Sequence, residues 1–131
     1  NELARGLGIA DSVIQTGRIP NELIPTYYAK ANVVAVPSRY DLLGIVALEA
    51  LACGTPVVVS KYAGVSRYIT DDFGYIGDPE DPLDFSSKIV EILRDDEKAV
   101  EMGKRGRQFI VENFSWSKLA QQLHTIYRNA L

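Results

Sequence analysis

Two carboxylates, Asp41 and Glu49, lie eight residues apart in the stretch YDLLGIVALEALACGTPVVVS, residues 40–60. Glu49 is the only acid in a helical pattern that begins near Gly44 and consists mainly of alanine, leucine and other apolar residues. A carboxylate can accept hydrogen bonds from two neighbouring hydroxyl groups, such as those of a ribose. Asp41 precedes the helix, where an acid can either accept hydrogen bonds from a sugar or simply cap the helix.

The start of the same helix has the features of a phosphate site. The first turn of a helix has main-chain N–H groups without intrahelical partners, and the helix dipole favours an anion there. Gly44 has no Cβ to obstruct a phosphate. We therefore expect Gly44 and Ile45 to donate main-chain N–H groups to a diphosphate. Glu49 would then face a ribose, and Asp41 a sugar on the other side of the phosphates.

Apolar strands and helices alternate around this stretch, which predicts an α/β fold with a Rossmann-like parallel sheet. Residues 33–37 form a continuous apolar run without polar alternation, which is typical of a parallel strand covered on both faces. In such sheets ligands bind at the carboxyl ends of the strands. The other expected strands are 12–17, 56–60 and 73–77, and the expected helices are 1–8, 21–31 (capped by Asn21), 44–53, 64–70, 82–93, 97–112 and 116–130. Leu119, Leu123, Ile126 and Tyr127 mark the expected buried face of the last helix.

Composition limits the functions that this chain can have. Its 131 residues fit one domain, and its net charge of −3 gives no reason to expect a nucleic-acid partner. The sequence GKRG, residues 103–106, has the letters of a nucleic-acid-binding loop but lies within a helical pattern. One cysteine and one histidine exclude an internal disulfide and a zinc site built from those ligands. We read His124, in the last helix, as a surface or packing residue.

The termini and hydropathy give two further expectations. The chain lacks an initiator methionine and begins in a helical pattern, so we expect it to be part of a longer protein. It contains neither a signal-peptide pattern nor an apolar run of about 20 residues, and we expect a cytoplasmic protein.

The order of these features resembles the C-terminal nucleotide-binding domain of retaining glycosyltransferases of family 4, the group 1 glycosyltransferases, which have the GT-B architecture. The family pattern E-x-x-G-x-x-x-x-E-A-x-A-x-G-x-P-V reads DLLGIVALEALACGTPVV here. The tail also resembles the closing helices of the family, with Phe114, Ser115 and Trp116 in the usual place. The resemblance covers nearly all of residues 1–131, as one partial donor-binding domain with residues 82–131 as its closing helices.

The resemblance implies a role for each matching residue. Glu49 would hold the ribose, Asp41 the donor sugar, and Gly44 and Ile45 the diphosphate. The loop that takes the base, mainly by main-chain contacts, falls on Arg18 and Ile19. Asp41 and Glu49 are the residues on which we expect catalysis to depend.

The resemblance also implies a reaction. The family transfers a hexose with retention, here from a UDP-, GDP- or ADP-sugar to a saccharide or lipid-linked acceptor, without a cofactor or an obligatory metal. Peripheral membrane association is implied for the full protein. Two alternatives stay open, namely a non-catalytic nucleotide-binding module of the same fold and a domain like that of a nucleotide-sugar epimerase.

The sequence departs from the family pattern at several positions. Asp41 is one methylene shorter than the usual glutamate, Ala63-Gly64 replaces a Gly-Gly pair, and Arg67 replaces an acid. The family's cationic residues for the diphosphate and its acceptor domain would precede residue 1.

The match also has a consequence for the sheet. In the family the strands of this sheet have the order 3-2-1-4-5-6. Residues 12–17 match the third strand and residues 33–37 the fourth, so strands 1 and 2, which lie between them, would be missing. Exposed strand edges invite pairing with another chain. The expected outcomes are relocation of strand 12–17, pairing of two copies, or a cut parent protein. Expressed alone, the chain should be oligomeric or poorly soluble, whereas a monodisperse monomer in light scattering would contradict this expectation.

Overall fold

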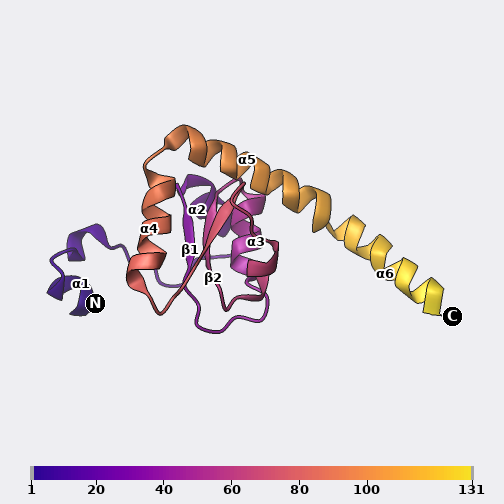
Figure 1. Ribbon diagram of the computed structural model, residues 1–131, viewed down its shortest axis with the longest axis horizontal. Helices are drawn as coiled ribbons and strands as arrows, with labels where there is room; N and C mark the ends of the chain where they lie inside the picture. The colour runs from indigo at the N-terminus through magenta and orange to yellow at the C-terminus, as the bar shows by residue number, and fades with distance from the viewer. Residues whose placement is uncertain (1, 131) are drawn as a thin grey trace.

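Three short parallel strands form the centre of the structure, a computed structural model that describes residues 2–130 (Figure 1). The strands are β1 (Val34–Val36), β2 (Val57–Ser60) and β3 (Gly74–Gly77), in the order β1-β2-β3. Val36 lies opposite Val59, which in turn lies opposite Ile76. The predicted α/β class is confirmed, as are these three strands to within one or two residues.

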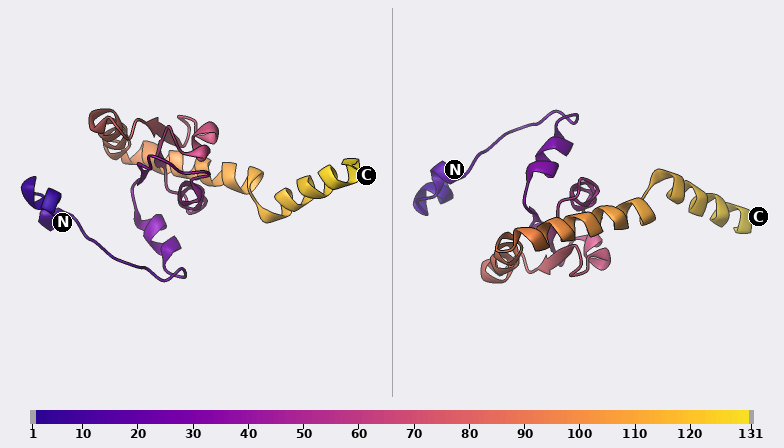
Figure 2. Two further views of the ribbon diagram at one scale, coloured as in Figure 1. Left: turned by 90° about the horizontal axis from the view of Figure 1, so that it is seen from below. Right: turned by 90° about the horizontal axis from the view of Figure 1, so that it is seen from above.

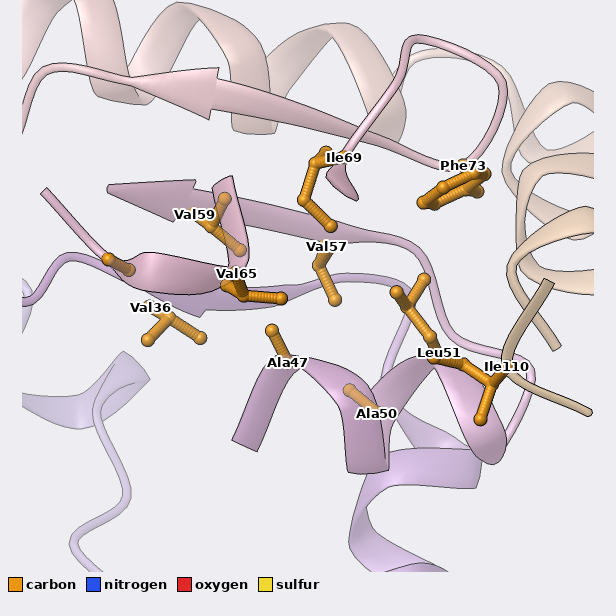
Figure 3. Packing of buried hydrophobic residues seen from close by; sticks show 11 residues of the cluster. Val36, Ala47, Ala50, Leu51, Val57, Val59, Val65, Ile69, Phe73 and Ile110 are labelled. Carbon is orange, nitrogen blue, oxygen red and sulfur yellow. The ribbon is translucent and has the colours of Figure 1, made fainter. Parts of the chain in front are cut away.

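The central strand β2 is buried on both faces of the sheet. Val57 and Val59 belong to a cluster that includes residues of α3 (Ile45–Ala52), as Figure 3 shows, whereas Val58 packs against α4 (Pro82–Leu93) and α5 (Asp96–Asn113). All three valines have no exposed surface. The edge strand β1 is less covered than predicted, because Ala35 is exposed and only Val36 is buried.

The helices after the sheet begin where the sequence predicts. The Asp81 side chain accepts hydrogen bonds from the main-chain N–H groups of Leu83 and Asp84, and Pro82 occupies the first turn of α4. Such a cap is typical of a stable helix start. Asp95 caps α5 in the same way by accepting from the N–H of Lys98. The short 3-10 helix η2 (Gly64–Tyr68) confirms the predicted helical turn between β2 and β3.

Two glycines of the GKRG sequence let α5 pack closely on α3. A Cβ at Gly103 would lie 1.9 Å from the carbonyl oxygen of Gly54, directly after α3. A Cβ at Gly106 would lie 2.5 Å from Cδ2 of Leu51. Nη1 of Arg107 donates a hydrogen bond of 2.8 Å to the carbonyl of Ala52. The sequence therefore serves the packing of two helices, with Arg107 as part of the contact rather than a free surface cation.

The predicted strand at residues 12–17 is wrong. This part of the chain contains a short α1 (Glu2–Gly6), the 3-10 helix η1 (Ala10–Ser12) and then an irregular segment that runs clear of the sheet (Figure 2). Val13 has an extended backbone, but Ile14 is 86% exposed. A β-branched run becomes a strand only beside a partner strand, and none of the described strands lies next to it.

Two predictions about helix surroundings are also wrong. α6 (Trp116–Ala130) has no buried side chain within the described residues and projects from the body of the molecule (Figure 1). Leu123 is 50% exposed and Ile126 is 62% exposed, so the apolar face of α6 is formed but is not covered. α2 (Ile24–Lys30) starts after Leu23 without a side-chain cap, and Asn21 contributes only its carbonyl oxygen, which accepts from the N–H of Ile24.

Candidate functional site

The loop before α3 lies at the carboxyl ends of β1 and β2. Asp41 forms a parallel bridge with Ala63, and the N–H of Gly64 donates a hydrogen bond of 3.0 Å to the carbonyl of Asp41. A Cβ at Gly64 would lie 2.0 Å from the carbonyl oxygen of Leu42, so the two loops touch main chain to main chain. This contact fixes the approach to α3 beside the edge at which parallel sheets bind ligands.

Gly44 adopts a conformation that requires glycine. It is the N-cap of α3 with φ +79° and ψ +46°, in the left-handed region. A Cβ there would lie 2.6 Å from Cγ1 of the buried Val65. The glycine is therefore required by the fold of this loop, independently of any ligand.

Substituting alanine for Gly44 should destabilise the protein more than the same change at Gly54. Both glycines have positive φ, +79° and +83°, but nothing lies within 4 Å of a Cβ at Gly54. The left-handed conformation costs alanine about 1–2 kcal/mol at either position, and overpacking against Val65 should add about 1–3 kcal/mol at Gly44 alone. Urea unfolding of the two variants measures the difference, and equal losses of unfolding free energy would contradict this account.

The Asp41 carboxylate is hydrogen bonded within the loop before α3. Its Oδ1 accepts hydrogen bonds from the main-chain N–H groups of Gly44 at 2.7 Å and Leu43 at 3.1 Å. Neither N–H belongs to α3, which has no side-chain cap, so Asp41 orders the turn before the helix instead of capping it. It also occupies the Gly44 N–H that we expected to face a diphosphate. A phosphate that bound this N–H would have to displace the carboxylate.

The next main-chain donors of α3 are free. No described residue accepts a hydrogen bond from the N–H groups of Ile45 and Val46, and the two residues are 58% and 40% exposed. These N–H groups lie at the positive end of the helix dipole, which suits a phosphate. Ile45 thus has a free N–H, as does Val46, which the sequence analysis did not single out, and the binding of a diphosphate by Ile45 stays a prediction.

Glu49 lies on an exposed part of α3, beyond its first turn, and has a tyrosine as partner. The Tyr28 hydroxyl donates a hydrogen bond of 3.2 Å to Oε2 of Glu49. Burial, together with this hydrogen bond, raises the pKa of the Tyr28 phenol, so the phenol remains a donor. The sequence analysis did not single out this pair, because 21 residues of chain separate the two side chains.

Glu49 also borders a hollow between α3 and the junction of α5 and α6. The hollow has a volume of about 390 Å³, and Glu49 is its one charged lining residue. Its other lining residues are apolar and include Ile45, Ala52, Ile110, Phe114 and Trp116. A ligand on Glu49 would therefore meet apolar surface on this side.

The remaining predicted residues are not brought to this site. Arg18 and Ile19 line a separate hollow with their neighbours Pro20, Asn21 and Glu22, and no residue of α3 belongs to it. Figure 2 shows that the chain before α2 leaves the body of the molecule. Their role in binding a base stays a prediction.

Two cationic side chains near the strand ends already have partners within the protein. Nζ of Lys61, which follows β2, lies 2.5 Å from Oδ2 of Asp78, and this hydrogen bond lowers the pKa of Asp78. Arg67 donates from Nε to the carbonyl of Gly64 at 3.0 Å. Within residues 2–130, no three His, Cys, Asp or Glu side chains gather in a group that could hold a metal ion. No helix in that range is long and apolar enough to cross a membrane.

Comparison with known proteins gives consistent matches. The family model described as "Glycosyl transferases group 1" matches residues 1–109. A D-inositol 3-phosphate glycosyltransferase of Corynebacterium diphtheriae is 38% identical over 98% of this chain and 30% of its own length. A GDP-mannose-dependent alpha-(1-6)-phosphatidylinositol monomannoside mannosyltransferase of Mycolicibacterium smegmatis is 35% identical over 87% of this chain and 32% of its own length.

The fold has a close counterpart among solved structures. Sucrose-phosphate synthase from Thermosynechococcus elongatus superimposes with a TM-score of 0.90 and 36% identity, over 98% of this chain and 33% of that one. This chain therefore spans about a third of the length of the proteins that it matches.

Proposed function

Because this chain belongs to the group 1 glycosyltransferase family, we propose that it binds the nucleotide-sugar donor of a retaining hexosyltransferase. The acceptor would be a saccharide or a lipid-linked sugar. A relative that is 35% identical is named as GDP-mannose-dependent, which supports a nucleotide-sugar donor. The chain spans about a third of its relatives, so acceptor binding and catalysis would need other parts of a longer protein, and the chain alone should be inactive.

One observation carries this proposal. The start of α3 offers two free main-chain donors at the carboxyl edge of the sheet, and the exposed acid Glu49 follows one turn later on the same helix. The donors suit a diphosphate, and the acid suits the hydroxyl groups of a pentose. A nucleoside diphosphate has both groups next to each other.

Calorimetry with the 131-residue chain tests the proposal. UDP, GDP and ADP are titrated separately, and we expect one of them to bind more tightly than inorganic pyrophosphate, because only the nucleotide reaches both the helix start and Glu49. The variant Glu49→Gln should weaken this binding. Glu112→Gln, which changes an exposed acid on a different helix, is its control and should bind like the unmodified chain. If no nucleotide binds better than pyrophosphate, the proposed donor site is refuted.

The position of Asp41 favours a second candidate, a nucleotide-binding module without transferase activity. Its Oδ1 already accepts hydrogen bonds from two main-chain N–H groups of its own loop. In this case the sugar of a nucleotide sugar would add nothing to binding.

Asp41→Ala distinguishes the two candidates. If Asp41 holds the sugar, a nucleotide sugar and its bare nucleotide should differ in affinity, and the variant should erase that difference. The variant also frees the Gly44 N–H and removes a negative charge, so the bare nucleotide should bind as tightly as before or more tightly. Calorimetry with both ligands measures this, and identical affinities in the unmodified chain would favour the module.

A further inference from the structure

We propose that Tyr28 is a positioning residue, which holds the Glu49 carboxylate in the orientation that receives the pentose of the nucleotide. This inference rests on the proposed function. Tyr28 comes from α2, on a different part of the fold from the helix that carries Glu49. Two observations support this role. Tyr28 is held firmly by the core, and the Glu49 carboxylate has no other hydrogen-bond partner among the described residues.

Glu49 has few contacts of its own that fix its side chain. It is exposed, and the Tyr28 hydroxyl is the only described group that hydrogen bonds its carboxylate. A free glutamate side chain samples many rotamers, and ordering it when a ligand binds costs entropy. A hydrogen bond to a fixed partner removes part of that cost before the ligand arrives.

Tyr28 is itself fixed from two sides. Its main-chain carbonyl accepts a hydrogen bond of 2.6 Å from Oγ1 of Thr55, a residue that is only 2% exposed. Its side chain is half-buried and packs against the core cluster that contains β2 and α3. Thr55 also follows directly after the helix stop at Gly54, and its N–H donates to the carbonyl of Ala50. Packing against the core therefore fixes the position of the Tyr28 hydroxyl. The hydroxyl in turn orients the Glu49 carboxylate.

The contact leaves the acid free to bind a diol. The tyrosine donates to Oε2 only, and an ionised carboxylate has about four acceptor positions. Because burial and the hydrogen bond raise the pKa of Tyr28, the phenol keeps its proton at neutral pH. The tyrosine thus orients the carboxylate without adding a charge to the site.

The neighbouring residue provides a matched control. Tyr27 precedes Tyr28 on α2, is 51% exposed, and its hydroxyl forms no hydrogen bond with the described residues. Tyr28→Phe and Tyr27→Phe remove the same atom from adjacent positions. Both variants keep the ring, so packing against the core is preserved.

The experiment compares UDP, GDP and ADP with the 2′,3′-dideoxy form of each, by calorimetry on the 131-residue chain. Tyr28→Phe should weaken the ribonucleotide that binds by about threefold to tenfold, as expected for one hydrogen bond, and leave its dideoxy form unchanged. Tyr27→Phe should change neither. In a Glu49→Ala background Tyr28→Phe should have no further effect, because the acceptor that it orients is gone.

The outcomes separate the two proposals. If no nucleotide binds, the proposed function fails and the positioning role fails with it. If the ribonucleotide is preferred over its dideoxy form but Tyr28→Phe keeps that preference, only the role of Tyr28 is overturned. An equal weakening of both forms by Tyr28→Phe would mean that the tyrosine supports the fold alone, and would also overturn the inference.

Discussion

Glu49→Gln should weaken the binding of a ribonucleoside diphosphate by about tenfold to a hundredfold. A hydrogen bond to a charged group contributes about 1.5–3 kcal/mol, and each 1.4 kcal/mol is a factor of ten in affinity. Glutamine keeps the length and shape of the side chain but replaces one acceptor oxygen by a donor, so it cannot accept from two adjacent hydroxyl groups with the same strength. Calorimetry at constant ionic strength measures the loss.

The dideoxy nucleotide is the control for this change. It lacks both hydroxyl groups, so Glu49→Gln should leave its affinity unchanged or slightly increased, because a negative charge near the phosphates is removed. If the substitution weakens the ribo and dideoxy forms equally, Glu49 does not contact the pentose. An unchanged affinity for both forms would contradict the site itself.

Gly103→Ala should destabilise the protein by forcing α5 away from α3. Its new Cβ would lie 1.9 Å from the carbonyl oxygen of Gly54, and this main-chain atom cannot rotate away as a side chain can. α5 would have to move away from α3, which contributes much of the core on that face of the sheet. We expect a net loss of about 1–2 kcal/mol, since overpacking against a main-chain atom should cost the upper part of the usual range of about 1–3 kcal/mol, and alanine gains roughly 1 kcal/mol over glycine in a helix.

Gly106→Ala, on the same helix, controls for helix propensity. Its Cβ would lie 2.5 Å from Cδ2 of Leu51, the end of a side chain, which can change rotamer. In urea unfolding, the free energy of unfolding of Gly103→Ala should therefore be lower than that of Gly106→Ala by about 1 kcal/mol or more. If Gly103→Ala is as stable as the unmodified chain, the close contact between α5 and α3 is not correct.

The sequence predicted best the elements whose partners lie within the chain. The valines of β2 were expected to be covered on both faces, and the structure buries them between α3 on one side and α4 and α5 on the other. Caps such as Asp81 were predictable because they act on residues two and three positions away. In these cases local sequence and tertiary packing favour the same structure.

The failures concern segments without a partner in the described structure. Residues 13–17 have the composition of a strand, and α6 has the apolar spacing of a packed helix, yet neither meets a neighbour that would cover it. Periodicity reports which face of a segment is apolar, but not whether anything lies against it.

The site was predicted only in part, for a related reason. Glu49 and the helix start lie within one motif, so their spacing in the sequence is also their spacing on α3. Tyr28 reaches Glu49 through the packing of α2 on α3, and no local pattern records that contact. Which groups Asp41 contacts depends on the turn of the loop, where Gly44 adopts a left-handed conformation.

The hydrogen bond from the Gly44 N–H to Asp41 has a consequence for selectivity. The Asp41 carboxylate already accepts the hydrogen bond that the Gly44 N–H could otherwise donate to a small inorganic anion. Free orthophosphate would have to compete for the Gly44 N–H with the Asp41 carboxylate, whose effective concentration is high because it belongs to the same chain. A larger ligand that is held at a second point can win that competition, whereas free orthophosphate should gain only the Ile45 and Val46 N–H groups and bind more weakly.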